Sequence, residues 1–189
     1  MNAANKLTLL RVIMIPAFLV VLYLDVPYAN WIALAIFALA SLTDLLDGYI
    51  ARHYDQTTDF GKFMDPLADK CLVVAALLWF VQGHGSNLQM PAWALLIVIV
   101  REFAVSGLRM QAAAGGKVIA AGKSGKIKTA STMACICLML VLPELEAISF
   151  FANWGVLVFD VCVWIIVATT VYSGVEYLIV NRKVFSGMK

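Results

Sequence analysis

Apolar stretches of about 20 residues recur along the whole chain, and this pattern constrains the fold more than any other feature. An α-helix needs a stretch of this length to cross the hydrocarbon core of a bilayer. Charged residues make up only 14% of the 189 residues, against roughly 25% in soluble domains. The sequence therefore predicts an all-α integral membrane protein, a single domain over 1–189 built as a bundle of six transmembrane helices. The predicted helices cover about 8–24, 31–52, 63–82, 91–112, 127–143 and 154–180.

Lysine and arginine are divided unequally between the two sides of this predicted bundle. With the N-terminus inside, the outer loops near 25–30, 83–90 and 143–153 contain neither residue. All 14 basic residues then lie in the inner tails, the inner loops or the helix ends that face them. Because positive charge marks cytosolic segments, we expect a multi-pass protein of the cell membrane with both termini in the cytosol. The first apolar run has no convincing cleavage site after it, so we expect a retained helix there.

Four aspartates within 26 residues interrupt the second and third apolar stretches: Asp44, Asp47, Asp65 and Asp69. An ionised carboxylate in or near hydrocarbon costs at least ~2.5 kcal/mol, so such a cluster needs compensation. Mutual repulsion between the carboxylates calls for a counter-charge, which a divalent metal would supply. Oxygen-only ligands suit Mg²⁺ or Mn²⁺ better than zinc or copper.

The spacing of the aspartates predicts that they meet. Asp44 and Asp47 are three residues apart and share a helix face. Asp65 and Asp69 share a face of the next helix if it continues past Pro66, which either opens or kinks that helix. The short connection makes the two helices antiparallel neighbours. The four carboxylates are therefore expected to converge near the cytosolic surface.

Small residues flank the carboxylates at Gly48, Ala51 and Gly61, and Arg52 lies among them. Small residues at this spacing often allow close helix packing. They also allow a phosphorylated ligand to approach the backbone. Beside four carboxylates and Arg52, we favour the ligand.

The pattern Asp44-x2-Asp47-Gly48-x2-Ala51-Arg52-x8-Gly61-x3-Asp65-x3-Asp69 resembles, at all eight defined positions, the signature of the CDP-alcohol phosphotransferase family. The resemblance implies a six-helix membrane fold, often dimeric, that transfers a phosphatidyl or similar group from a CDP-linked donor to an alcohol and releases CMP. It further implies that the aspartates hold two divalent ions and that Asp69 is the general base. It assigns the nucleotide pocket to Gly48, Ala51, Arg52 and Gly61.

A second group of charged residues bears on the alcohol acceptor. The stretch from Arg101 to Arg109 and the run from Gly122 to Thr129 are rich in cations, too deep or too dense for orientation alone. We expect a pocket for the phosphate of a dianionic acceptor, formed by Arg109, Lys126, Lys128, Arg101 and Lys123. Together with Asn5, Thr8 and Arg11, these stretches resemble the bacterial branch of the family that joins CDP-diacylglycerol to glycerol 3-phosphate.

Other interpretations remain open on the sequence alone. A sister enzyme could share the donor site and use another acceptor, as cardiolipin synthase and phosphatidylinositol phosphate synthase do. A divalent-cation transporter would also need carboxylates in the membrane, but no acidic path continues to the far side. A polyprenyl-diphosphate enzyme lacks its usual Asp-Asp-x-x-Asp run here. Membrane lipids and a second copy of the chain are the expected partners, nucleic acid is not, and the four cysteines are expected to be core thiols.

Overall fold

The computed structural model describes residues 3–24, 26–53, 59–84, 87–114, 122–146 and 154–182. The side chains of 3–7, 44–53, 59–63, 65, 66, 114 and 146 are not among those described. Over the described residues the chain forms six α-helices and no strand, which confirms the predicted all-α fold. The helices are α1 (Ala3–Tyr23), α2 (Ala29–His53), α3 (Asp59–Gln82), α4 (Ala92–Ala114), α5 (Lys123–Glu146) and α6 (Gly155–Val180).

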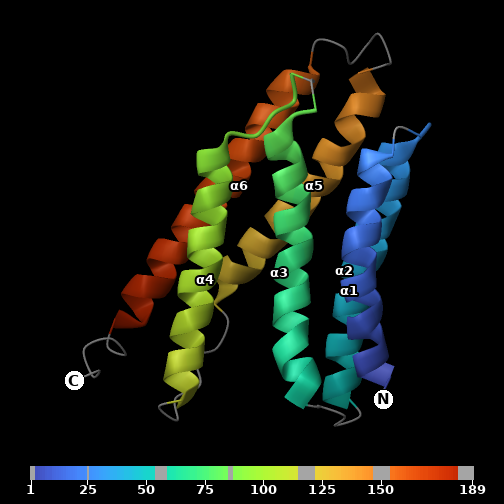
Figure 1. Cartoon of the computed structure of the whole chain (residues 1–189). Helices are drawn as coiled ribbons and strands as arrows, with labels where there is room; N and C mark the ends of the chain where they lie inside the picture. The colour runs from blue at the N-terminus through green and yellow to red at the C-terminus, as the bar shows by residue number, and fades with distance from the viewer. Residues whose placement is uncertain are drawn as a thin grey trace.

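Successive helices run in opposite directions (Figure 1). The helices α1, α3 and α5 begin at the end drawn at the bottom of Figure 1, and α2, α4 and α6 finish there. We call this the lower end of the bundle. Both the aspartate-bearing part of α2 and the beginning of α3 are therefore at the lower end, as are the cation-rich end of α4 and beginning of α5.

The helices pack in two groups of three that contact each other. α1 lies against α2 and α3, while α6 lies against α4 and α5. Contacts of α2 with α5 and of α3 with α4 join the groups, and α2 and α3 also contact each other. Each of the helices α2 to α5 thus has a neighbour in the other group.

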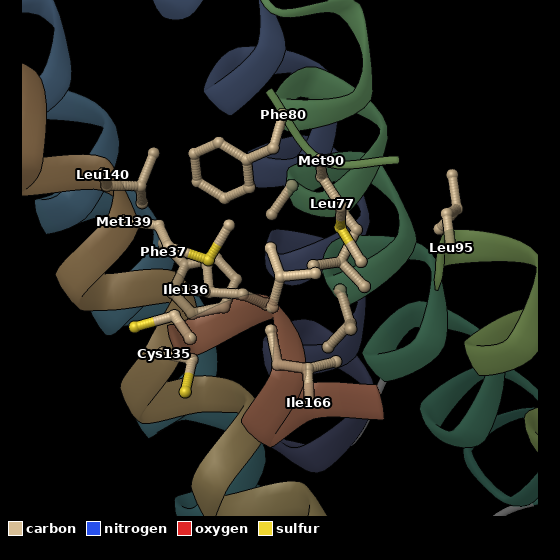
Figure 2. Packing of buried hydrophobic residues seen from close by; sticks show 14 of the residues in the cluster. Phe37, Leu77, Phe80, Met90, Leu95, Cys135, Ile136, Met139, Leu140 and Ile166 are labelled. Carbon is tan, nitrogen blue, oxygen red and sulfur yellow. The ribbon is translucent and has the colours of Figure 1, made fainter. Parts of the chain in front are cut away.

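Apolar side chains from all six helices fill the centre of the bundle. Figure 2 shows Phe37 of α2, Leu77 of α3, three residues of α5 and Ile166 of α6 converging on one cluster, and all are fully buried. The three from α5 are Ile136, Met139 and Leu140. Because lipid tails are as apolar as these side chains, van der Waals packing holds such a core together in a membrane.

The outer surface of the bundle is also apolar. Phe103, Trp164 and Leu96 are 71%, 61% and 60% exposed, which suits a surface that faces lipid rather than water. Among the described residues, Lys123–Leu145 and Gly155–Val180 are long and apolar enough to cross a membrane, and Thr8–Tyr23 and Ala29–Thr43 are shorter apolar helices. These features are those of an all-α membrane protein.

Two local expectations need correction. α3 begins at Asp59, well before Pro66, so the alternative in which Pro66 opens the helix is wrong. All four cysteines are free thiols, but only Cys135 and Cys162 are buried; Cys71 is exposed on α3, so it is not a core thiol. The sequence showed that Cys71 lies in an apolar span, yet a span that faces lipid on one side has exposed positions as well as buried ones.

The turn after α3 closes the end opposite to the lower end. Gly83 has φ +67°, and a Cβ there would lie 3.0 Å from the side chain of Gln89. Glycine meets both demands because it has no Cβ. Gln89 donates from Nε2 to the carbonyl oxygen of Val81 at 2.9 Å, which holds the chain close before α4 begins.

Candidate active site

A cavity of about 600 Å³ lies between α2, α3, α4 and α5. α2 and α3 contribute Ser41, Asp69 and Lys70; α4 contributes Arg101, Glu102, Val105, Ser106 and Arg109; α5 contributes Gly125, Lys126, Thr129, Ala130 and Met133. Two carboxylates, one each from α3 and α4, therefore share a space with four cations from α3, α4 and α5. Because most of these α4 and α5 residues belong to the halves nearer the lower end, the cavity lies toward that end (Figure 1).

The cavity brings together residues that the sequence placed in two separate motifs. Asp69 belongs to the aspartate motif of α2 and α3, whereas Arg101, Arg109 and Lys126 belong to the predicted phosphate pocket. The three cations follow Asp69 in the sequence by 32 to 57 positions. The wall therefore combines a group able to accept a proton with groups able to bind an anion.

Two other residues of the predicted phosphate pocket lie elsewhere. Lys123 is exposed at the beginning of α5 and is not on the cavity wall. Lys128 is only 4% exposed and lines a neighbouring cavity of about 30 Å³, whose wall also includes Asp69 and Glu102. The reason is the helical turn. Residues two apart on a helix point to different faces, so Lys126 and Lys128 cannot both face the larger cavity.

The remaining residues of the aspartate motif have helical backbones but fall outside the described side chains: Asp44, Asp47, Asp65, Gly48, Ala51, Arg52 and Gly61. Their positions on α2 and α3 are at the lower end, where these two contacting helices finish and begin. Among the described side chains, no three of His, Cys, Asp or Glu gather to hold a metal ion. The four candidate ligands on these two helices are all carboxylates, with Asp69 on the cavity wall, and this chemistry fits Mg²⁺ or Mn²⁺.

Arg101 is held from two sides. Its Nη1 donates to Oε1 of Glu102 at 2.9 Å, and its Nη2 donates to the hydroxyl of Ser173 on α6. The same Oε1 of Glu102 accepts a hydrogen bond from Nζ of Lys128 at 2.8 Å. One carboxylate thus joins a cation of α4 to a cation of α5.

Arg109 lies against the last helix. Its guanidinium carbon is 5.6 Å from the centre of the Tyr177 ring, within the range of a cation–π contact. Its Nε is buried and has no hydrogen-bond partner among the described residues. The ring supports the guanidinium from one face, and the N–H groups of its two Nη atoms remain to bind an anion in the cavity.

Residues of α1, near the N-terminus, support α2. Thr8 is 1% exposed, and Arg11 is fully buried and donates from Nε to the carbonyl oxygen of Ala40 at 3.3 Å. A buried arginine that reaches the neighbouring backbone holds α1 to α2 close to Ser41, on the cavity wall. Asn5 falls outside the described side chains.

Sequence reasoning missed the contributions of Glu102, Ser173 and Tyr177. The sequence does contain a signal for the role of Glu102: an acidic residue inside an apolar span needs a charged partner, and Arg101 is adjacent. Ser173 and Tyr177 are four residues apart on one face of α6 and both are buried, but their role depends on which helices pack against α6. Hydropathy alone does not give that information.

Comparison with known proteins identifies the family. Residues 1–172 match the sequence profile described as CDP-alcohol phosphatidyltransferase. The chain belongs to the CDP-alcohol phosphatidyltransferase family. This confirms the resemblance inferred from the eight-residue motif and makes the protein a transferase of phospholipid biosynthesis, which decides against the transporter and the polyprenyl-diphosphate enzyme.

Relatives within the family share most of the chain. It is 41% identical over 194 aligned residues to the CDP-diacylglycerol–glycerol-3-phosphate 3-phosphatidyltransferase of Bacillus subtilis, with 95% of each chain covered. Proteins of the same name in Pseudomonas fluorescens and Rickettsia felis are 40% and 30% identical, covering 82% and 97% of this chain and 79% and 97% of their own. Enzymes of this family depend on divalent metal ions, in agreement with the carboxylate donors of α2 and α3.

Proposed function

We propose that this protein transfers the phosphatidyl group of CDP-diacylglycerol to sn-glycerol 3-phosphate, giving phosphatidylglycerophosphate and CMP. The observation that supports this most is the cavity whose wall holds Asp69 together with Arg101, Arg109 and Lys126. Relatives that carry the name of this reaction, at 30% to 41% identity over most of the chain, support the same activity.

The reaction needs a nucleophile, a proton acceptor and a stabilised leaving group. The free primary hydroxyl of glycerol 3-phosphate attacks the phosphorus of the phosphatidyl group. A new P–O bond forms, the P–O bond to CMP breaks, and Asp69 accepts the hydroxyl proton. Asp44, Asp47, Asp65 and Asp69 would hold two divalent ions, Mg²⁺ or Mn²⁺, which would neutralise the diphosphate when bound. The nucleotide would lie along Gly48, Ala51, Arg52 and Gly61.

The cations of α4 and α5 select the acceptor. Arg101 and Arg109 present planar sets of N–H donors that suit a phosphate group, and Lys126 adds a third positive charge. An acceptor without a phosphate would offer no anion to Lys126 or to the N–H donors of Arg101 and Arg109 that the protein leaves unused. Lys123 is exposed at the beginning of α5, where its charge can raise the local concentration of an anionic acceptor.

The membrane arrangement follows from the distribution of charge. We infer that all six helices cross the cell membrane as one domain over 1–189, with the lower end of the bundle and both termini in the cytosol. All 14 basic residues were assigned to this side on the positive-inside rule. The cavity then opens where soluble glycerol 3-phosphate is found. The family resemblance favours a homodimer.

A direct assay tests the proposed reaction. Purified protein in detergent is given CDP-diacylglycerol, Mg²⁺ and one of several alcohols, and CMP release and the lipid product are measured. We expect phosphatidylglycerophosphate from glycerol 3-phosphate. Turnover with phosphatidylglycerol or inositol phosphate in its place would move the protein to a sister reaction of the same family.

Neutralising Arg109 is expected to weaken binding of the acceptor more than binding of the donor. In Arg109→Gln, the KM for glycerol 3-phosphate should rise roughly 10- to 150-fold, because loss of one charge-assisted contact costs about 1.5–3 kcal/mol. The KM for CDP-diacylglycerol should change far less. The matched control is Arg182→Gln, which removes an exposed arginine just after α6. Equal turnover of glycerol and glycerol 3-phosphate by the parent enzyme would contradict the phosphate pocket.

Cysteine labelling in sealed cells tests the orientation. A cysteine at Asn87, between α3 and α4, should react with a membrane-impermeant maleimide added from outside. A cysteine at Gly122, just before α5, should react only after the membrane is opened. The parent protein measures the background from its own cysteines. The reverse accessibility would overturn the orientation and place the cavity on the wrong side for a cytosolic substrate.

A further inference from the structure

Glu102 is the centre of a buried charged triad. Its carboxylate oxygen accepts hydrogen bonds from Arg101 at 2.9 Å and from Lys128 at 2.8 Å. The side chains of Arg101, Lys128 and Glu102 are only 12%, 5% and 18% exposed. Buried charges of this kind are tolerated when they are paired and hydrogen-bonded. Two cations and one anion leave the triad with one net positive charge.

Ser173 and Gly174 of α6 hold the opposite side of Arg101. Ser173 is 1% exposed and accepts a hydrogen bond from Nη2, and a Cβ at position 174 would lie 3.2 Å from Cγ of Arg101. The arginine side chain is therefore enclosed by α4, α5 and α6. Ser173 and Gly174 fall just beyond residues 1–172, the part of the chain that matches the family profile.

The contacts of Arg101 leave donors for a ligand. A guanidinium has five N–H groups. Glu102 and Ser173 each take one, and Nε is buried without a partner among the described residues. Two N–H groups on the Nη atoms remain, and Arg101 is on the wall of the larger cavity. The two protein contacts fix the guanidinium plane and so fix where those donors point.

We propose that Glu102 and Ser173 are positioning residues that hold Arg101 for the phosphate of the acceptor, and that Lys128 neutralises Glu102 rather than binding the phosphate itself. This inference rests on the proposed function. Lys128 is absent from the wall of the larger cavity and its ammonium group is bound to Glu102. Without Lys128, Glu102 would cancel the charge of Arg101. With Lys128, Arg101 presents a full positive charge to the acceptor.

A comparison of two variants tests the role of Lys128. Lys128→Met removes the cation and leaves Glu102 paired with Arg101 alone, so the acceptor KM should rise roughly 10-fold or more. The double variant Lys128→Met with Glu102→Gln removes both charges, and the carboxamide oxygen can still accept from Arg101. Its acceptor KM should return to within about 3-fold of the parent value. A double variant no better than Lys128→Met would overturn the proposal, because a direct phosphate ligand cannot be restored by changing Glu102.

Ser173 gives a second test that does not depend on a buried charge. Ser173→Ala should raise the acceptor KM several-fold to about 10-fold, with kcat and donor KM nearly unchanged, and Ser173→Thr should retain the parent KM because it keeps the hydroxyl. The matched control is Thr169→Val, which removes another hydroxyl of α6, one that donates to the carbonyl oxygen of Ile165 at 2.7 Å and lies outside the cavity wall. An acceptor KM that is the same in Ser173→Ala and the parent would remove Ser173 from this role.

Two further readouts separate the possible failures. Thermal unfolding in detergent reports whether each variant is folded, and titration calorimetry with glycerol 3-phosphate and Mg²⁺ reports acceptor binding without turnover. A parent enzyme inactive toward glycerol 3-phosphate would contradict the proposed function itself. A parent active with that acceptor, but with no restoration in the double variant, would contradict only the positioning inference.

Discussion

Replacing Asp69 with asparagine is expected to lower kcat about 10²- to 10⁴-fold, the usual contribution of a positioned general base. Asparagine has nearly the same size and shape as aspartate, but its amide does not accept the proton of the attacking hydroxyl at neutral pH. Asp69 lies on the wall of the cavity that also holds Arg101 and Arg109, so an acceptor phosphate bound there brings its hydroxyl within reach of α3. Folding and binding of CDP-diacylglycerol should be largely retained.

Three measurements check this result: CMP release, the Kd for CDP-diacylglycerol and the unfolding temperature. The matched control is Asp160→Asn, which makes the same chemical change at an exposed position of α6 away from the cavity wall. If Asp69→Asn turned over at a near-normal rate, the base would have to be another group. An unfolded Asp69→Asn would instead make its carboxylate a structural requirement, and Asp69→Glu would then test whether any carboxylate there restores turnover.

The helices were predictable because a membrane leaves few choices for the backbone. Every buried N–H and C=O must be paired inside the bilayer, so each apolar span has to be helical. The described helices overlap all six predicted ranges. The observed and predicted helix bounds differ where polar residues continue a helix beyond the hydrocarbon core of the bilayer. α3 begins at Asp59 rather than near 63, and α5 begins at Lys123 rather than near 127. Hydropathy marks the part of a helix that lies in the hydrocarbon core, and not the polar turns that extend the helix beyond it.

The early beginning of α5 explains why only some of the residues predicted for a phosphate pocket lie on the wall of the larger cavity. If residues 122–126 were a loop, Lys126 and Lys128 could both turn toward one ligand. Because α5 already includes Lys123, the two lysines are about 200° apart around the helix axis. Lys126 faces the larger cavity, and Lys128 points into the protein to meet Glu102.

The contributions of α6 were beyond the sequence pattern for a different reason. Ser173 and Tyr177 matter because α6 packs beside α4, where it reaches Arg101 and Arg109. A pattern of apolar residues shows that a helix is buried on one side, but it does not name the neighbour. The contact between α2 and α3, which carry the aspartate motif, was easier to predict, because these helices are consecutive and a short connection makes them neighbours.

Removing divalent metal is expected to abolish the transferase activity. Metal ions that neutralise the diphosphate contribute several kcal/mol of transition-state stabilisation, which corresponds to a loss of about 10³-fold or more in rate. EDTA should inhibit the enzyme, and Mg²⁺ or Mn²⁺ should restore it, because the four proposed ligands of α2 and α3 are carboxylate oxygens. Asp44→Ala and Asp65→Ala should lose metal-dependent binding of CDP as well as turnover, since each removes a ligand.

Calorimetric titration of CDP with and without Mg²⁺ separates these variants from Asp69→Asn, which keeps one oxygen ligand for the metal and should still bind the donor. Asp160→Ala is the matched control, because it removes an exposed carboxylate of α6 and should leave both CDP binding and its metal dependence unchanged. Full turnover after rigorous removal of metal would contradict the two-metal site. The intramembrane carboxylates would then have to be neutralised by protons or by cations of the protein, and Asp44→Asn and Asp65→Asn should in that case be active.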